Sequence, residues 1–280
     1  MFLIQIIFLA SLTSLFITAL ANLKCSNELP PLIPNYYLME KCHRSKLGIA
    51  AKANYTSLAS CQRLGIEKKA LALNFSPPEA HEHGEELEYT CEVLKCAEVD
   101  GGLSLVNDTR YDFYSIYAKP LPDENSTCVP ATGMFSLLHK KLNYTEAQAL
   151  CKNMTSVLAD VMSEQRTDML ANLVAGANIE AAFVALRSFN GSAFFSANGD
   201  SLDCTTYRAW APGHPRRYRD KFDCVVITRQ RTWQSTPCKK KYLVLCELVP
   251  GGPYKRGSIF PSKKRNDTQP TNENGDSNKL

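Results

Sequence analysis

Apolar residues recur with helix and strand periodicity in two parts of the chain, and this pattern predicts an α+β protein. In residues 56–65, Leu58, Cys61 and Leu64 fall at helical spacing between a Thr/Ser cap and a glycine. Three short β-prone runs share this first part of the chain, at residues 69–75, 89–96 and 111–117. The first part is therefore predicted to contain one helix, fixed by a thiol, and a small sheet.

The second part of the chain predicts two helices followed by strands. In residues 145–154, Thr145 and Gln148 are spaced as a capping box. The apolar face of this helix consists of Ala147, Leu150, Cys151 and Met154. A second helix is expected to begin at the Ser163 cap and to bury Met169, Leu170, Leu173 and Val174. Strands are expected at residues 183–186, 224–228 and 242–246, with a long irregular stretch between the first two.

The ends of the chain and one internal segment lack these periodic patterns. Residues 1–21 are uncharged, apolar and end on a small-x-small motif, which predicts a signal peptide, with an uncleaved membrane anchor as the alternative. Residues 119–127 are expected to form a linker. The polar residues 250–280 are expected to be disordered; within them Lys263-Lys264-Arg265 is either a processing site or solvated surface. Two domains, at residues 22–118 and 128–249, are predicted between these segments.

Cysteines and glycosylation motifs indicate an extracellular address. The eleven cysteines form no CxxC pair, so disulfides in an oxidising compartment are expected, and the odd number leaves one thiol that is free or pairs between chains. Motifs for N-glycosylation begin at Asn54, Asn74, Asn107, Asn125, Asn143, Asn153, Asn190 and Asn266. Each site in use must lie at the surface. We therefore expect a secreted glycoprotein with no membrane span once the signal is removed.

The first part of the chain resembles an apple or PAN module over about residues 25–118. The resemblance rests on the order of a helix, an ALALNF strand, a TCEVLKC segment and a closing aromatic strand. It implies a disulfide that joins the helix to the central strands, from Cys61 to Cys91 or Cys96. It also implies a module that binds proteins or glycans and has no catalytic residues. The odd thiol is expected in this part.

Residues 128–249 resemble a C-type lectin-like domain. The motifs that carry the resemblance are residues 147–151 and 183–186, the WAPGHP segment at 210–215, residues 223–225, Trp233, Cys238 and residues 245–247. The resemblance implies two helices, antiparallel strands, a long loop, and disulfides Cys151–Cys246 and Cys224–Cys238. It also implies that Trp210 and Trp233 are core residues. Cys128 and Cys204 have no standard place in the family and are expected to pair with each other.

Sugar-binding members of this family hold Ca²⁺ through side-chain oxygens on the long loop. The matching positions in this chain are His214, Arg216, Phe222, Gln234 and Ser235. None of them is a carboxylate, and Ca²⁺ requires about six to eight oxygen ligands, usually with carboxylates among them. We therefore expect no metal and no cofactor at this site. The retained Pro215 predicts that the loop keeps its turn, with a cis bond after His214.

Positive charge is concentrated on the same stretch. Residues 204–246 carry a net charge of +8, whereas the whole chain carries +4. The candidate ligand-binding residues are Arg208, His214, Arg216, Arg217, Arg219 and Lys221. They match a polyanionic glycan or an acidic protein surface; the alternative is a solvated basic loop. The mild overall charge argues against nucleic acid as a partner.

Two further sets of residues are candidates for metal binding or catalysis. His81-Glu82-His83 lies in an acidic run and either binds Zn²⁺ or Cu²⁺ or, as the missing third ligand favours, is a solvated loop. The five histidines lie in no catalytic motif, so no enzyme is expected.

The function expected from the sequence is extracellular recognition through a calcium-independent lectin-like domain, with the apple-like part as a second contact surface. The first alternative is a structural component of an extracellular or cuticular matrix that self-associates through the odd cysteine or through opposite charges. The second alternative is a calcium-dependent carbohydrate-binding lectin.

Overall fold

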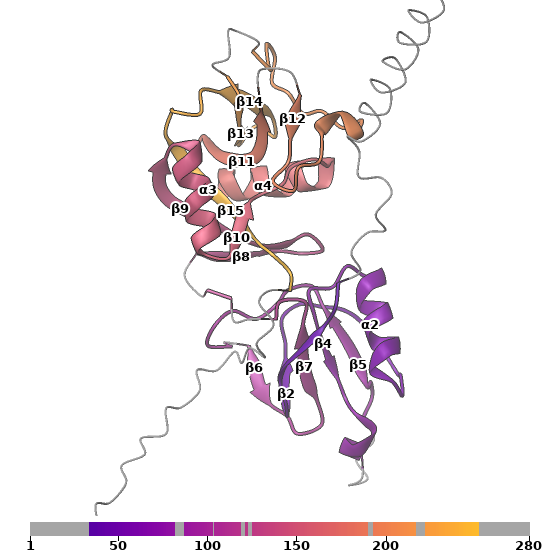
Figure 1. Ribbon diagram of the computed structural model, residues 1–280. Helices are drawn as coiled ribbons and strands as arrows, with labels where there is room; N and C mark the ends of the chain where they lie inside the picture. The colour runs from indigo at the N-terminus through magenta and orange to yellow at the C-terminus, as the bar shows by residue number, and fades with distance from the viewer. Residues whose placement is uncertain are drawn as a thin grey trace, which may run out of the picture.

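The computed structural model describes residues 34–81, 87–102, 104–118, 121–122, 125–189, 193–216 and 222–251. These residues form a five-stranded sheet, an eight-stranded sheet and a two-stranded ribbon (Figure 1). Three α-helices accompany the strands in this part of the chain, so the α+β fold class is confirmed. No helix among the described residues is long and apolar enough to cross a membrane. The predicted signal peptide and most of the predicted tail lie outside the described residues.

The first sheet is antiparallel throughout, in the order β1-β7-β4-β5-β3. Its strands are β1 (Tyr37–Glu40), β3 (Ile49–Ala53), β4 (Ala72–Phe75), β5 (Cys91–Leu94) and β7 (Asp112–Ser115). The ribbon pairs β2 (His43–Ser45) with β6 (Leu105–Asn107), and the 3-10 helix η2 (Pro78–His81) follows β4. All four residues of the central strand β4 are buried, because elements cover both faces of this sheet. The expected strands are confirmed, while the apple resemblance stays a prediction.

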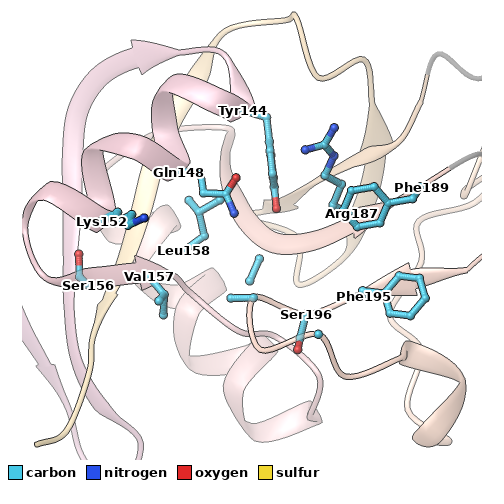
Figure 2. A pocket seen from close by; sticks show the side chains of 13 residues that line it. Tyr144, Gln148, Lys152, Ser156, Val157, Leu158, Arg187, Phe189, Phe195 and Ser196 are labelled. Atoms are coloured by element: carbon cyan, nitrogen blue, oxygen red, sulfur yellow. The ribbon is translucent and has the colours of Figure 1, made fainter. Parts of the chain in front are cut away.

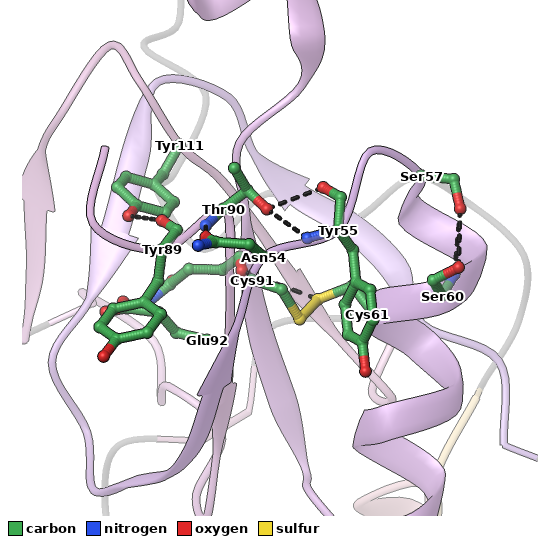
Figure 3. The surroundings of a disulfide bond; sticks show 11 residues. Asn54, Tyr55, Ser57, Ser60, Cys61, Tyr89, Thr90, Cys91, Glu92 and Tyr111 are labelled. Carbon is green, nitrogen blue, oxygen red and sulfur yellow. Dashed lines mark hydrogen bonds between the residues drawn. A yellow bond between two sulfur atoms is a disulfide. The ribbon is translucent and has the colours of Figure 1, made fainter. Parts of the chain in front are cut away.

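Helix α2 (Leu58–Glu67) is fastened to this sheet by a disulfide (Figure 3). Its first turn is capped by Ser57, whose side chain accepts a hydrogen bond from the Ser60 amide. The Cys61–Cys91 disulfide joins the helix to β5, which confirms one of the two predicted pairings. Beside it, the Thr90 hydroxyl donates to the Tyr55 carbonyl and accepts from the Tyr55 amide, both at 2.7 Å. The start of the helix and the start of β5 are thus fixed together.

The sequence pattern predicted that α2 ends at Gly65, and this is wrong. The helix continues to Glu67, and Gly65 is buried against the ring of Tyr36. A Cβ at position 65 would lie 2.5 Å from the Tyr36 hydroxyl oxygen. The ring has little room to move, because its hydroxyl donates to the Ala70 carbonyl at 2.8 Å and its side chain is buried. Glycine is therefore required here by close packing.

A buried polar network crosses the first sheet. Arg44 donates to both carboxylate oxygens of the buried Glu92, at 2.8 and 2.5 Å, and Asn74 donates to the same carboxylate at 3.1 Å. Burial alone would raise the pKa of Glu92, but the hydrogen bonds from Arg44 and Asn74 outweigh it and hold the pKa below its usual value. The Asn74 side chain also accepts from the Ser45 amide at 2.9 Å. The network thus uses both ends of the Asn74 amide group.

The burial of Asn74 corrects one glycosylation prediction. Asn74 is 0% exposed and its side chain is fully hydrogen-bonded, so the packing leaves no room for a glycan. The predicted acceptors that the structure leaves exposed are Asn54, Asn107, Asn125 and Asn153. Asn143 is half-buried, and Asn190 and Asn266 lie outside the described residues. Use of the exposed sites stays a prediction.

The second sheet has β15 near its centre. Its main order is β14-β13-β11-β15-β9-β8, with β10 paired to β15 and β12 paired to β11. The strands are β8 (Ser126–Val129), β9 (Gly133–Leu142), β10 (Ser156–Leu158), β11 (Ala181–Ser188), β12 (Phe194–Phe195), β13 (Cys224–Thr228), β14 (Trp233–Thr236) and β15 (Tyr242–Leu248). β15 runs parallel to β11 and antiparallel to β9 and β10. The three strands expected in this part are confirmed.

Helices α3 (Tyr144–Asn153) and α4 (Glu164–Gly176) begin at asparagine and serine caps. The predicted box of Thr145 and Gln148 is wrong, because Asn143 caps α3 and forms the capping box with Glu146. The Ser163 cap of α4 is confirmed. Of the four residues expected to be buried there, Leu170 and Val174 are buried, whereas Met169 and Leu173 are half-buried.

The disulfides confirm the lectin-like framework and correct one pairing. Cys151–Cys246 joins α3 to β15, and Cys224–Cys238 joins β13 to the segment before β15. The expected Cys128–Cys204 bridge is wrong, because β8 places Cys128 beside Cys96 and these two are bonded. Cys204 is disulfide-bonded as well. Among the described cysteines Cys42 is free, so the odd thiol does lie in the first part.

The Cys96–Cys128 disulfide joins the segment after β5 of the first sheet to β8 of the second, and further contacts connect the two sheets. The buried side chains of Met134 and Leu248, from the second sheet, belong to the hydrophobic cluster of the first sheet. The Tyr117 hydroxyl oxygen accepts a hydrogen bond from the Met134 amide at 2.9 Å. The predicted linker at residues 119–127 overlaps the start of β8. The division into two domains stays a prediction.

We expect Gly65→Ala to destabilise the protein by about 1–3 kcal/mol, because the added methyl group overpacks the contact with Tyr36. Gly176→Ala is the matched control, since Gly176 is also helical but has no atom within 4 Å of the position of an added Cβ. Alanine there should leave the free energy of unfolding unchanged or raise it by less than about 1 kcal/mol. Urea unfolding of both variants measures the difference; equal midpoints would contradict the packing argument.

Candidate functional site

The two tryptophans at the base of the long loop pack against each other and against the hydrophobic core. Trp233 is fully buried, and its indole N–H donates to the Thr167 hydroxyl at 3.1 Å. Trp210 packs edge-on against it, with ring centroids 5.5 Å apart. Backbone hydrogen bonds from Trp233 to Ala209 and from Ala211 to Trp233 hold the two segments together. The predicted core role is confirmed for Trp233, whereas Trp210 is half-buried and packs against the core.

Beyond Trp210, three of the residues that match the family's calcium positions are hydrogen-bonded to one another. The Ser235 amide donates to His214 Nδ1 at 3.0 Å, and the Ser235 hydroxyl lies 3.1 Å from the same nitrogen. The Arg216 amide donates to the Ser235 hydroxyl oxygen at 2.8 Å. The peptide bond between His214 and Pro215 is cis, as predicted. We call this set, His214, Arg216 and Ser235, the serine clasp.

The serine clasp does not fit Ca²⁺. Its only side-chain oxygen belongs to Ser235 and already accepts a hydrogen bond, while Arg216 brings a positive charge. The Arg216 guanidinium lies over the ring of Phe222, with its central carbon 5.9 Å from the ring centroid. Phe222 also occupies one of the matching calcium positions, and its side chain offers no oxygen ligand. Only Gln234 remains as a neutral oxygen ligand, and this is far short of what Ca²⁺ requires. Among the described residues, no group of three or more His, Cys, Asp or Glu could hold a metal.

Hydrogen bonding also fixes the protonation state of His214. Burial and, secondly, the nearby Arg216 lower the pKa of His214 below its usual 6.5. Its Nδ1 accepts a hydrogen bond from a backbone amide, which requires the lone pair of the unprotonated nitrogen. His214 is therefore neutral at neutral pH and acts as a structural acceptor.

The six basic candidates have different surroundings. Arg208 donates to the carbonyls of Thr205 and Tyr207, each at 2.7 Å, and its guanidinium lies 3.6 Å from the Asp203 carboxylate. Its hydrogen bonds and its ion pair are thus made to neighbours in the sequence. The structure brings His214 and Arg216 together, and Arg216 is exposed. The remaining three, Arg217, Arg219 and Lys221, lie outside the described residues.

A basic groove that was not predicted lies next to these positions. It has a volume of about 690 Å³ and is lined by lysines and neutral polar side chains. We call it the lysine groove, after Lys141, Lys240 and Lys241; Gln234 and the acidic residue Glu180 also line it. Pairing of Leu142 with Tyr242 brings Lys141 beside the other two lysines. Lys141 lies outside the basic stretch, so only the register of β9 and β15 could have revealed it.

The histidine motif in the first part stays untested. His81 ends the short helix η2, and residues 82–86, which include Glu82 and His83, lie outside the described residues.

Comparison with known proteins assigns the second part of the chain to a family. The family model described as Lectin C-type domain matches residues 140–248. Collectin-43 of Bos taurus is 29% identical over 110 residues, which are 38% of this chain and 33% of that protein. Collectin-10 of Gallus gallus is 24% identical over 115 residues, which are 41% of each chain. The chain thus spans a third to two fifths of the length of these curated relatives.

A solved structure also matches part of this chain. Human lithostathine matches with a TM-score of 0.39 and 18% identity, covering 44% of this chain and 87% of that structure. The disulfides Cys151–Cys246 and Cys224–Cys238 and the paired tryptophans lie within the region that the family model matches. Residues 140–248 of this chain match the C-type lectin domain family.

Proposed function

We propose that this chain is a secreted recognition protein whose C-type lectin domain binds a polyanionic glycan or an acidic protein surface without calcium. The serine clasp carries the proposal, because its hydrogen bonds occupy the positions at which sugar-binding relatives hold the metal. The loop keeps its cis turn through contacts of its own side chains and backbone. Recognition must then rely on charge and surface contacts.

The charges around the serine clasp support an anionic ligand. Lys141, Lys240 and Lys241 face a groove that also includes Gln234, the neighbour of Ser235 in the chain. One carboxylate, that of Glu180, is among the described residues that line it. Lysine and arginine side chains on a concave surface attract sulfate and carboxylate groups by long-range electrostatics and bind them by charge-assisted hydrogen bonds. The groove and Arg216 together supply such a surface.

The rest of the chain fits an extracellular binding role. Four disulfides join the described elements, as expected of a protein from an oxidising compartment. C-type lectin domains act as binding modules, so we propose no catalytic activity, no cofactor and no nucleic-acid partner. The apple-like part would add a second contact surface.

Heparin chromatography tests the ligand class. The purified chain should bind heparin at low salt, with or without EDTA, and elute as salt rises. Replacing Lys141, Lys240 and Lys241 with glutamine should weaken binding about tenfold, as expected for three exposed charge contacts of about 0.5 kcal/mol each. The matched control replaces three exposed lysines of the first part, Lys41, Lys46 and Lys68, with glutamine. This control should bind heparin with wild-type affinity.

Three results would contradict this proposal. Flow-through at low salt would exclude a polyanionic ligand. An equal loss in the groove variant and its control would show attraction by net charge alone. Loss of glycan binding in EDTA would favour the calcium-dependent alternative.

Acid, and not EDTA, should loosen the long loop. The pKa of His214 is lower in the folded chain than its usual 6.5, so the unfolded chain takes up this proton at higher pH. The stability that neutral His214 supplies is therefore complete above about pH 6.5 and is lost as pH falls below it. His214→Gln should show a smaller fall in melting temperature between pH 7 and pH 5 than wild type, while EDTA should leave the wild-type value unchanged. Equal pH profiles for the two proteins would contradict this role.

The matrix alternative is favoured by one observation, the free and exposed thiol of Cys42. If the protein self-associates through this residue, a non-reducing gel should show dimers that disappear with reductant and in Cys42→Ser. A monomer in both proteins, under oxidising conditions, would exclude this route.

A further inference from the structure

A second cleft in the lectin domain lies away from the serine clasp. It has a volume of about 590 Å³, within the usual range for small-molecule sites, and lies between α3, β10, the end of β11 and residues 194–199 (Figure 2). The lysine groove uses the other end of β11, since Ala181 lines the groove and Arg187 lines this cleft. The two sites are thus separated by the length of one strand.

The floor and walls of the cleft are apolar and aromatic. Val157, Leu158 and Ala185 supply aliphatic surface, and the rings of Tyr144 and Phe195 line the sides. In Figure 2, Tyr144 extends into the cleft from α3, and Phe195 lies across from it. Such a lining removes water from the flat or aliphatic body of a ligand, which the hydrophobic effect favours.

Arg187 places a positive charge in this apolar setting. Its guanidinium carbon lies 5.7 Å from the centroid of the Tyr144 ring and 4.9 Å from that of Phe189. Its Nε is buried and has no hydrogen-bond partner among the described residues. Protein atoms cover this Nε, whereas the residue as a whole is half-buried, so an anionic group would be bound by the terminal nitrogens of the guanidinium.

The other polar members of the cleft are consistent with this charge. Lys152 brings a second cation, at the end of the cleft that Ser156 marks in Figure 2, opposite Arg187. Gln148 and Ser196 add neutral hydrogen-bonding groups. The described residues that line the cleft include no carboxylate. Charge and shape together select a small molecule with an anionic group and an apolar body.

We propose that this cleft binds an amphipathic organic anion, with its anionic group on Arg187 and an aromatic or aliphatic body against Tyr144, Leu158 and Phe195. This would be a small-molecule site in addition to the polyanion site. The two differ in chemistry, because the lysine groove presents exposed ammonium groups, whereas the cleft pairs one guanidinium with an apolar floor.

Fluorescence titration with 8-anilino-1-naphthalenesulfonate tests the proposal, because this probe has an aromatic body and one sulfonate. N-phenyl-1-naphthylamine has a similar body without the charge. The purified chain should bind the sulfonate at least tenfold more tightly than the neutral analogue. Arg187→Gln should weaken sulfonate binding about tenfold and leave binding of the neutral analogue unchanged, whereas Arg187→Lys, which keeps the charge, should stay within a few-fold of wild type.

Two further variants separate this site from general effects. Ala197 is exposed at the rim of the cleft, so Ala197→Trp should fill the space and weaken both probes without disturbing the core. Arg229→Gln removes an exposed charge elsewhere in the same domain and should change neither. Unchanged sulfonate affinity in a folded Arg187→Gln, or unchanged binding of both probes in Ala197→Trp, would overturn the proposal.

Discussion

The Cys151–Cys246 disulfide fixes α3 onto β15, and most of the lectin domain is arranged around that strand. β15 pairs with β9, β10 and β11, and β8, β12 and β13 each pair with one of these partners, so only β14 lies two strands away from it among the described strands. The bonded cysteines are 95 residues apart, and closing a loop of this length stabilises the folded chain by about 4–5 kcal/mol in the chain-entropy account. α3 also forms a wall of the apolar cleft, so this bond fastens one wall of that site to the central strand.

The central sheet gives one domain two surface hollows with different linings. β11 is buried along most of its length, yet its ends reach separate surfaces, the lysine groove at Ala181 and the apolar cleft at Arg187. In the long loop the serine clasp holds its residues together, with a backbone amide as donor and a neutral histidine as acceptor.

Local patterns in the sequence predicted the elements, whereas contacts between distant residues decided the details. Caps and periodicity located α4 and the main strands, and the family resemblance supplied two disulfides. The start of α3 was misplaced because two capping boxes overlap there; burial of Tyr144 against Phe183, with its amide bonded to the Cys238 carbonyl, selects the earlier one. The lysine groove and the cleft depend on which strands become neighbours, and no local pattern encodes that pairing.

The residues at the positions that match the family's calcium site set the charge of this surface. None of them is a carboxylate; the Arg216 guanidinium lies over the ring of Phe222, and the Arg216 backbone amide donates to the Ser235 hydroxyl oxygen. A guanidinium in this place repels a cation and attracts an anion. The charge that argues against Ca²⁺ here thus also argues for the ligand class that we propose, an anion shared with the exposed lysines of the neighbouring groove.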